Sequence, residues 1–190
     1  MEPVKLLERA QEWTGGIVAG VREPDLARPT PCEDWDVARL LDHLIADVET
    51  FNKVASGEPA DLVADIDPTA QQNVGRAWPD PTDHFERLVK ESRELWSRPG
   101  ALDQKYKTSR SEVPGEALIM ISLIDTLVHG WDLAKATGQS TQMPEDVAEA
   151  ALAFTTKMMK DKRIGFGEPV AVPDDASVTD RLVGWLGRQP

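Results

Sequence analysis

The chain has 190 residues, a formal net charge of −12 and a single cysteine. This length suits one domain with a sizeable core. The acidic charge and the lack of a basic stripe argue against nucleic-acid binding, because phosphate contacts need clustered Lys and Arg. No run of about 18 apolar residues predicts a membrane span, and the first residues do not resemble a signal peptide. We therefore expect a cytoplasmic protein with a small-molecule or protein partner, in line with its sparse cysteine content.

The first two predicted helices flank a proline-rich connector. Apolar residues at helical spacing predict a helix over residues 3–21, and three prolines keep residues 22–35 out of helix. Asp34 or Asp36 is expected to cap the second helix, which ends near residues 55–60. Its core-facing stripe consists of Val37, Leu40, Leu41, Leu44, Ile45, Val48 and Phe51.

The middle of the chain is predicted to hold a long loop region and a third helix. Residues 57–80 are acidic and weakly patterned, so at most one short helix is expected there. In the following segment Thr82 or Asp83 is expected to cap a helix that Pro99 and Gly100 terminate.

Three further helices complete the predicted fold. The fourth spans about residues 114–137 and ends at Gly138, the fifth begins on Pro144, and a short amphipathic helix starts near Ser177. No strand pair is predicted. The pattern indicates one all-α domain over residues 1–190, with four long helices, an extra C-terminal helix and long loops.

A polar stripe interrupts the apolar fourth helix. In "LIDTLVHGWDLA", Asp125 is followed by His129 and Asp132. At about 100° per residue, His129 falls about 40° from Asp125, Ser122 about 60° and Asp132 about −20°. An ionised carboxylate in so apolar a helix must be paired or bound to a metal, because its burial otherwise costs several kcal/mol.

Asp125 and His129, one helical turn apart, are suited to supply two ligands to a metal ion. Zn²⁺, Ni²⁺ and Fe²⁺ all accept imidazole nitrogen and carboxylate oxygen. A third ligand must come from another helix, where the remaining histidines are His43 and His84. His43 lies at the edge of the apolar stripe with Asp47 one turn along, whereas His84 has polar neighbours. We therefore prefer His43.

Two other interpretations stay open on the pattern alone. The Asp–His pair is equally well explained as a structural hydrogen bond, with Asp132 holding His129 and Ser122 satisfying Asp125. Cys32 is a candidate nucleophile with a histidine as base, because a helix N-terminus follows it. A single small buried cysteine is the simpler explanation of Cys32.

Three blocks of sequence carry a family resemblance. They are "TPCEDWDVARLLDHL" at 30–44, "LVHGWDLAKATGQ" at 127–139 and "DRLVGWLGRQP" at 180–190. In this order they resemble an actinobacterial family related to the N-terminal domain of mycothiol-dependent maleylpyruvate isomerase, within the DinB/YfiT-like superfamily. The resemblance implies a DinB-like four-helix bundle that holds a divalent metal through three side chains.

Carried over by position, the resemblance implies His43, Asp125 and His129 as the metal ligands, with zinc as the first choice. Asp47 or Asp132 would then accept the second ring N–H of a ligating histidine. Many related proteins use three histidines, and the isomerase is similar but has Glu where this chain has Asp125. Because Asp is one methylene shorter, its ligation must be closer or through water.

The resemblance also implies a chemistry. It suggests a thiol-dependent transferase or isomerase that uses mycothiol and a small electrophile, in a protein that is a candidate homodimer. The isomerase has a further C-terminal domain for which this sequence leaves no room, so we do not expect maleylpyruvate isomerisation itself. The alternative is a non-catalytic metal-containing binding or stress-response module. Arg181 and Arg188 are expected to close over the bundle, or else to contact an anionic substrate.

Overall fold

The computed structural model of the protein describes residues 2–62, 80–159 and 166–190. Most of the predicted loop region over 57–80 therefore lies outside the described residues. The elements, in chain order, are α1 (Pro3–Gly20), the short 3-10 helix η1 (Glu23–Asp25), α2 (Val37–Ser56), α3 (Pro81–Trp96), β1 (Lys105–Lys107), β2 (Glu112–Pro114), α4 (Gly115–Thr137), α5 (Glu145–Met158) and α6 (Val178–Trp185).

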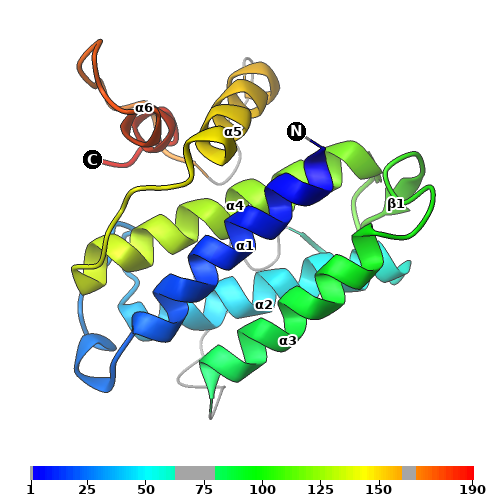
Figure 1. Cartoon of the computed structure of the whole chain (residues 1–190), viewed down its shortest axis with the longest axis horizontal. Coiled ribbons are helices and arrows are strands. Elements are labelled where there is room, and N and C mark those ends of the chain that lie inside the picture. The colour runs from blue at the N-terminus through cyan, green and yellow to red at the C-terminus, as the bar shows by residue number, and fades with distance from the viewer. Residues whose placement is uncertain (1, 63–79, 160–165) are drawn as a thin grey trace.

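Four long helices form the bundle. Helices α1 and α2 each pack against both α3 and α4, so that the four surround one core (Figure 1). Helix α5 lies outside the bundle against α1 and α4, and α6 packs on α5. The predicted all-α bundle with an additional C-terminal helix is confirmed.

Helix ends follow the predicted capping chemistry with one correction. The Asp36 carboxylate caps α2 by accepting a hydrogen bond of 2.9 Å from the Arg39 backbone N–H. Gly138 ends α4 in the left-handed conformation, at φ 73°. The predicted cap of α3 was wrong, because Asp80 caps it by accepting from the Asp83 N–H. Pro81 then takes the first helical position, where its missing N–H is harmless.

A small antiparallel hairpin corrects the prediction that the chain has no strand pair. Strands β1 and β2 have three residues each and pair Tyr106 with Val113. Tyr106 is buried against Trp96, with ring centroids 5.6 Å apart. Its hydroxyl donates a hydrogen bond of 3.0 Å to the Ala101 carbonyl. Strands this short offer too few alternating positions for a sequence pattern to reveal them.

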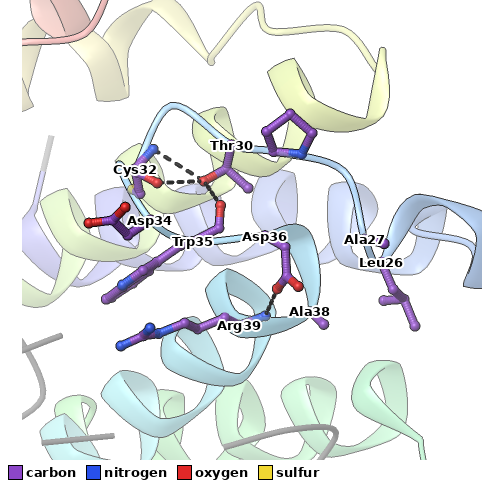
Figure 2. A pocket seen from close by; sticks show the side chains of 10 residues that line it. Leu26, Ala27, Thr30, Cys32, Asp34, Trp35, Asp36, Ala38 and Arg39 are labelled. Atoms are coloured by element: carbon purple, nitrogen blue, oxygen red, sulfur yellow. Dashed lines mark hydrogen bonds between the residues drawn. The ribbon is translucent and has the colours of Figure 1, made fainter. Parts of the chain in front are cut away.

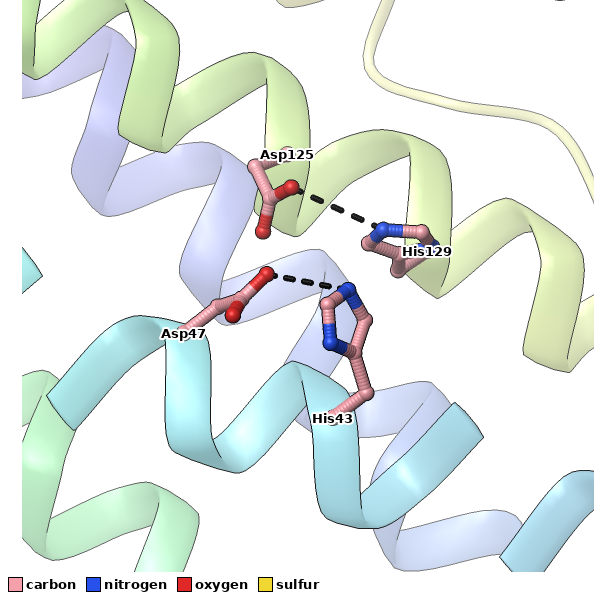
Figure 3. A group of neighbouring side chains, drawn as sticks. All are labelled: His43, Asp47, Asp125 and His129. Carbon is pink, nitrogen blue, oxygen red and sulfur yellow. Dashed lines mark ion pairs between the residues drawn. The ribbon is translucent and has the colours of Figure 1, made fainter. Parts of the chain in front are cut away.

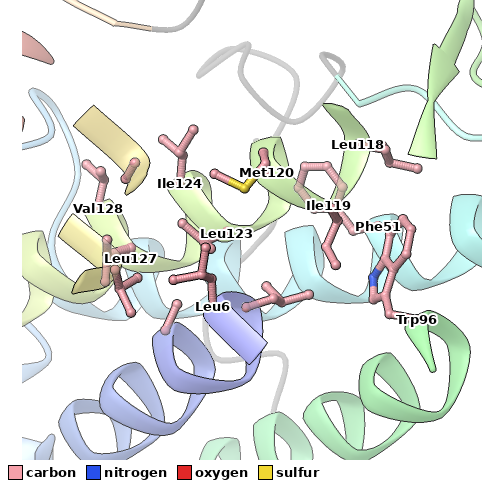
Figure 4. Close-up of a cluster of buried hydrophobic side chains, with 14 of the residues drawn as sticks. Leu6, Phe51, Trp96, Leu118, Ile119, Met120, Leu123, Ile124, Leu127 and Val128 are labelled. Atoms are coloured by element: carbon pink, nitrogen blue, oxygen red, sulfur yellow. The ribbon is translucent and has the colours of Figure 1, made fainter. Parts of the chain in front are cut away.

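Helix α4 is the centre of the core. It is long and apolar enough to cross a membrane by length and composition, but 78% of its most apolar 18-residue window is buried within the protein. Leu118, Leu123 and Leu127 have no exposed surface and contact the neighbouring helices (Figure 4). The apolar character of α4 is therefore explained by burial in the bundle, and its few polar residues are placed against adjacent structure.

Candidate metal centre

Two adjacent helices bring four metal-ligating side chains together. Helix α2 contributes His43 and Asp47, and α4 contributes Asp125 and His129 (Figure 3). One ligand atom from each residue lies within 4.8 Å of all the others. Both helices use an i, i+4 pair, a spacing that places two side chains on the same face. The structure therefore joins the three ligands expected from the sequence and adds Asp47 to them.

The Nε2 nitrogens of both histidines face this group. His43 Nε2 lies 3.0 Å from Asp47 Oδ2, and His129 Nε2 lies 3.5 Å from Asp125 Oδ1. Asp47 is thus placed among the ligand atoms and not behind His43, where it was expected to accept the second ring N–H. His84 is not part of the group, since it lies on α3 beside Arg87.

His43 is held in its neutral form. Burial, together with the positive charges of His129 and Arg39, lowers its pKa to about 2. A neutral imidazole keeps the nitrogen lone pair that a metal requires.

His129 has the opposite electrostatic environment. Burial opposes a charge on this ring, but the attraction of Asp125 and hydrogen bonds with Asp132 and Cys32 raise its pKa well above the ordinary 6.5. A proton on His129 therefore neutralises part of the carboxylate charge of the group. A divalent cation would fill the same electrostatic role with two charges.

Polar atoms without partners indicate that a cation fits the group. Asp125 Oδ2 is buried and accepts no hydrogen bond from the residues that the structure describes. Buried carboxylate oxygens are normally paired or coordinated. Two imidazoles and two carboxylates are also a donor set that Zn²⁺, Ni²⁺ and Fe²⁺ accept. His43 Nδ1 is likewise buried without a partner in the described structure, so no acceptor fixes that ring from behind.

Asp132, one of the two carboxylates considered as supports for a ligating histidine, lies behind His129. Its Oδ2 is 3.4 Å from His129 Nδ1, the nitrogen that points away from the group. Asp132 has no exposed surface. Burial opposes its charge, but the nearby Arg188 guanidinium and hydrogen bonds from His129 and Arg188 lower its pKa to about 2. An ionised acceptor in this position fixes the orientation and tautomer of the ring.

Cys32 contacts the same carboxylate. Its thiol donates to Asp132 Oδ2 at 3.2 Å and lies 3.9 Å from His129 Nδ1. Cys32, His129 and Asp132 are close enough to form a second cation site. However, Arg188 Nη2 is 2.9 Å from Asp132 Oδ2, and its positive charge repels a metal ion there. Among the described residues, the imidazole nitrogen nearest the Cys32 thiol is His129 Nδ1, and this nitrogen is already engaged with Asp132.

The proline-rich connector places Trp35 against the centre, and hydrogen bonds within the connector hold its shape (Figure 2). The Thr30 hydroxyl accepts a hydrogen bond from the Cys32 N–H at 3.2 Å and donates one to the Trp35 carbonyl at 2.9 Å. The Trp35 ring consequently lies against both histidines, with ring centroids 4.5 Å from His43 and 6.4 Å from His129. The loop thus shields the imidazoles from water.

A cavity of about 900 Å³ opens onto all four residues of the candidate cation group. Its apolar wall includes Phe51, Ile124 and Leu186, and Arg110 lies among its polar lining residues. Of the two arginines singled out in the sequence, Arg188 lines this cavity and Arg181 is exposed on α6. Trp131 is buried in the core and does not line the cavity.

Comparison with known proteins identifies the family. Residues 7–134 match the family model described as the mycothiol maleylpyruvate isomerase N-terminal domain. The chain belongs to this family. The matched range contains all four residues of the cation group and Asp132, so the resemblance expected from the sequence is confirmed.

Individual proteins also resemble this member of the isomerase N-terminal domain family. The chain is 30% identical to uncharacterized proteins of Mycobacterium tuberculosis strains CDC 1551 / Oshkosh and ATCC 25618 / H37Rv, across 99% of this chain and 98% of each relative. The crystal structure of the mycothiol-dependent maleylpyruvate isomerase superposes with a TM-score of 0.56 at 14% identity. That match covers 80% of this chain and 66% of the isomerase chain, and it shows a shared fold.

Proposed function

We propose that this protein is a divalent-metal-dependent transferase or isomerase that joins a low-molecular-weight thiol, mycothiol, to a small electrophile. The observation that carries the proposal is the group of two histidines and two carboxylates within 4.8 Å, facing a cavity of about 900 Å³. Membership of the isomerase N-terminal domain family supports mycothiol as the thiol. The proposed location is the cytoplasm, where small thiols are kept reduced.

The residues of the centre are proposed to have two roles, binding the cation and orienting its ligands. His43, Asp125 and His129 would hold the cation, zinc first and nickel or iron as alternatives, and Asp47 is placed to join them. When bound, such a cation supplies Lewis acidity that keeps a coordinating thiol deprotonated at neutral pH. Asp132 orients His129 from behind.

The cavity provides the space and an apolar wall for the reaction. Its volume of about 900 Å³ falls within the roughly 300–1,000 Å³ of small-molecule sites. Phe51, Ile124 and Leu186 give the cavity apolar surface beside the candidate ligands. A thiol and an electrophile held together there would react at a higher effective concentration than in solution.

A thiol-consumption assay tests the proposal. Zinc-loaded protein is mixed with mycothiol and a panel of small electrophiles, and free thiol and product are followed with time. We expect metal-dependent loss of thiol, or thiol-dependent isomerisation, that stops when the metal is removed by a chelator. Glutathione in place of mycothiol tests the choice of thiol. A protein that binds zinc and mycothiol but turns over no electrophile would instead be the non-catalytic binding module.

A further inference from the structure

Arg188, near the C-terminus, makes a two-pronged contact with Asp132. Its Nη2 lies 2.9 Å from Oδ2 and its Nε 3.3 Å from Oδ1. Both groups are removed from water, since the Arg188 side chain is 10% exposed and that of Asp132 is not exposed at all. Such a fork-to-carboxylate contact fixes the orientation of the carboxylate as well as its position.

Nη1 and Nη2 of the guanidinium make further contacts within the protein. Nη1 donates to the Leu186 carbonyl at 3.0 Å, and Nη2 lies 3.8 Å from Cys32 Sγ. The guanidinium carbon lies 5.5 Å from the centre of the Phe166 ring. All the guanidinium nitrogens are thus engaged with protein groups. Although Arg188 lines the cavity, this arrangement favours a role within the protein over contact with an anionic substrate.

The C-terminal segment holds Arg188 in place. The Arg188 N–H donates to the Val183 carbonyl of α6 at 2.9 Å, and the Val170 N–H donates to the Gly184 carbonyl at 2.8 Å. Helix α6 packs on α5, outside the four-helix bundle. Arg188 therefore links this outer segment to α4, where Asp132 lies.

A continuous chain of contacts runs from this segment to the cation group. Arg188 holds Asp132 Oδ2, and Asp132 Oδ2 lies 3.4 Å from His129 Nδ1. The other nitrogen of the same ring, Nε2, faces Asp125 in the group. A rotated Asp132 carboxylate would therefore no longer hold the ring whose far nitrogen faces the group.

We propose that Arg188 is a positioning residue of the metal centre, which fixes Asp132 and thereby the orientation of His129. This inference rests on the metal centre of the proposed function. It couples two events that are separate in the fold, the docking of the C-terminal segment and the loading of the cation. By linkage, docking of the C-terminal segment raises the affinity for the cation, and binding of the cation favours docking by the same factor.

Metal affinity, measured without any substrate, tests this role. The Zn²⁺ dissociation constants of the wild type, Arg188→Gln and Arg188→Lys are determined by competition with a chromophoric chelator. Arg181→Gln is the matched control, because it removes the same charge from an exposed position on α6. Loss of a supporting contact behind a ligand typically weakens binding by roughly 10- to 100-fold. We expect a Zn²⁺ affinity weakened to this extent in Arg188→Gln, a smaller loss of affinity in Arg188→Lys and the wild-type affinity in Arg181→Gln.

The visible spectrum of the Co²⁺-loaded protein separates positioning from general stabilisation. A turned His129 ring alters the ligand field, so the Arg188→Gln spectrum should differ from that of the wild type. Wild-type affinity and spectrum in folded Arg188→Gln would overturn the proposal, as would equal losses in Arg188→Gln and Arg181→Gln. If Arg188→Gln does not fold, Arg188→Lys decides, since an unchanged dissociation constant overturns the proposal and a raised one supports it. A wild type that binds no metal would refute the metal centre itself.

Discussion

The imidazole rings of His43 and His129 lie edge to face with their centroids 4.8 Å apart, although they come from different helices. Their environments push the two pKa values in opposite directions. Burial lowers the pKa of His43 to about 2, whereas Asp125, Asp132 and Cys32 raise that of His129 well above 6.5 against its burial. Without metal, one ring is neutral and the other carries the positive charge of the centre.

Metal binding should therefore release a proton from His129. At pH 7 its raised pKa leaves the ring protonated, and a ligating nitrogen must lose that proton. We expect roughly one proton per Zn²⁺ in a weakly buffered solution with a pH indicator. His129→Gln should abolish this release. Stoichiometric zinc binding by the wild type with no proton release would contradict the charge assignment.

The metal-free protein should become less stable as the pH falls below about 6.5. The folded pKa of His43 is about 2, so below 6.5 the unfolded chain takes up a proton that the folded chain does not. This lowers the free energy of unfolding by up to about 1.4 kcal/mol per pH unit. The contribution of His129 to the free energy of unfolding has the opposite pH dependence. It is fully present below pH 6.5, and it is lost as the pH rises through the raised pKa of the folded state.

Urea unfolding between pH 6.5 and 5 measures this effect, in the presence of a chelator. His43→Gln removes the group that resists protonation, so its stability should vary less with pH than that of the wild type. Identical pH dependence in the two proteins would show that His43 is not held neutral.

The contact between α1 and α4 beside the centre should tolerate no added methyl group. A Cβ at Gly130 would lie 2.5 Å from Thr14 Oγ1, and that hydroxyl is itself fixed by donating to the Thr126 carbonyl at 3.1 Å. Gly130→Ala is expected to destabilise the protein by about 1–3 kcal/mol. Gly16→Ala is the control, because a Cβ there meets nothing within 4 Å. It should stabilise α1 by roughly 0.5–1 kcal/mol, and thermal unfolding of both variants checks the pair.

Sequence reasoning was most successful where a residue's role depends on its own helix. The spacing of Asp125, His129 and Asp132 was enough to place all three on one face of α4, and the structure keeps this arrangement. The pairing of α4 with α2 was not visible from spacing. The preference for His43 over His84 came from its place at the edge of the apolar stripe, and the family resemblance supported it.

Contacts between distant segments were the part that the sequence could not show. Asp47 is one turn from His43, so either a ligand or a supporting role was compatible with its position. The direction of its carboxylate toward Nε2 depends on the packing of α2 on α4. Arg188 was noticed as a residue that closes over the bundle, but its contact with Asp132 spans 56 positions. No local pattern encodes such a pair.

Asp47 offers a direct test of the fourth ligand. Its carboxylate lies within the group, so Asp47→Asn should raise the Zn²⁺ dissociation constant by at least about 10-fold, the lower end of the losses seen when a metal site is disturbed. Glu49→Gln is the control on the same helix, since Glu49 pairs with Lys53 on the surface. Equal Zn²⁺ affinities of Asp47→Asn and the wild type would show that Asp47 is not a ligand.

Elemental analysis of the metal content shows whether the side chains of α2 and α4 bind a cation. Wild-type protein, His43→Ala, Asp125→Ala and the control His84→Ala are purified in parallel and equilibrated with Zn²⁺. We expect about one zinc per chain in the wild type and in His84→Ala, with a large loss in His43→Ala and Asp125→Ala. Equal metal content in all four proteins would contradict the site formed by α2 and α4.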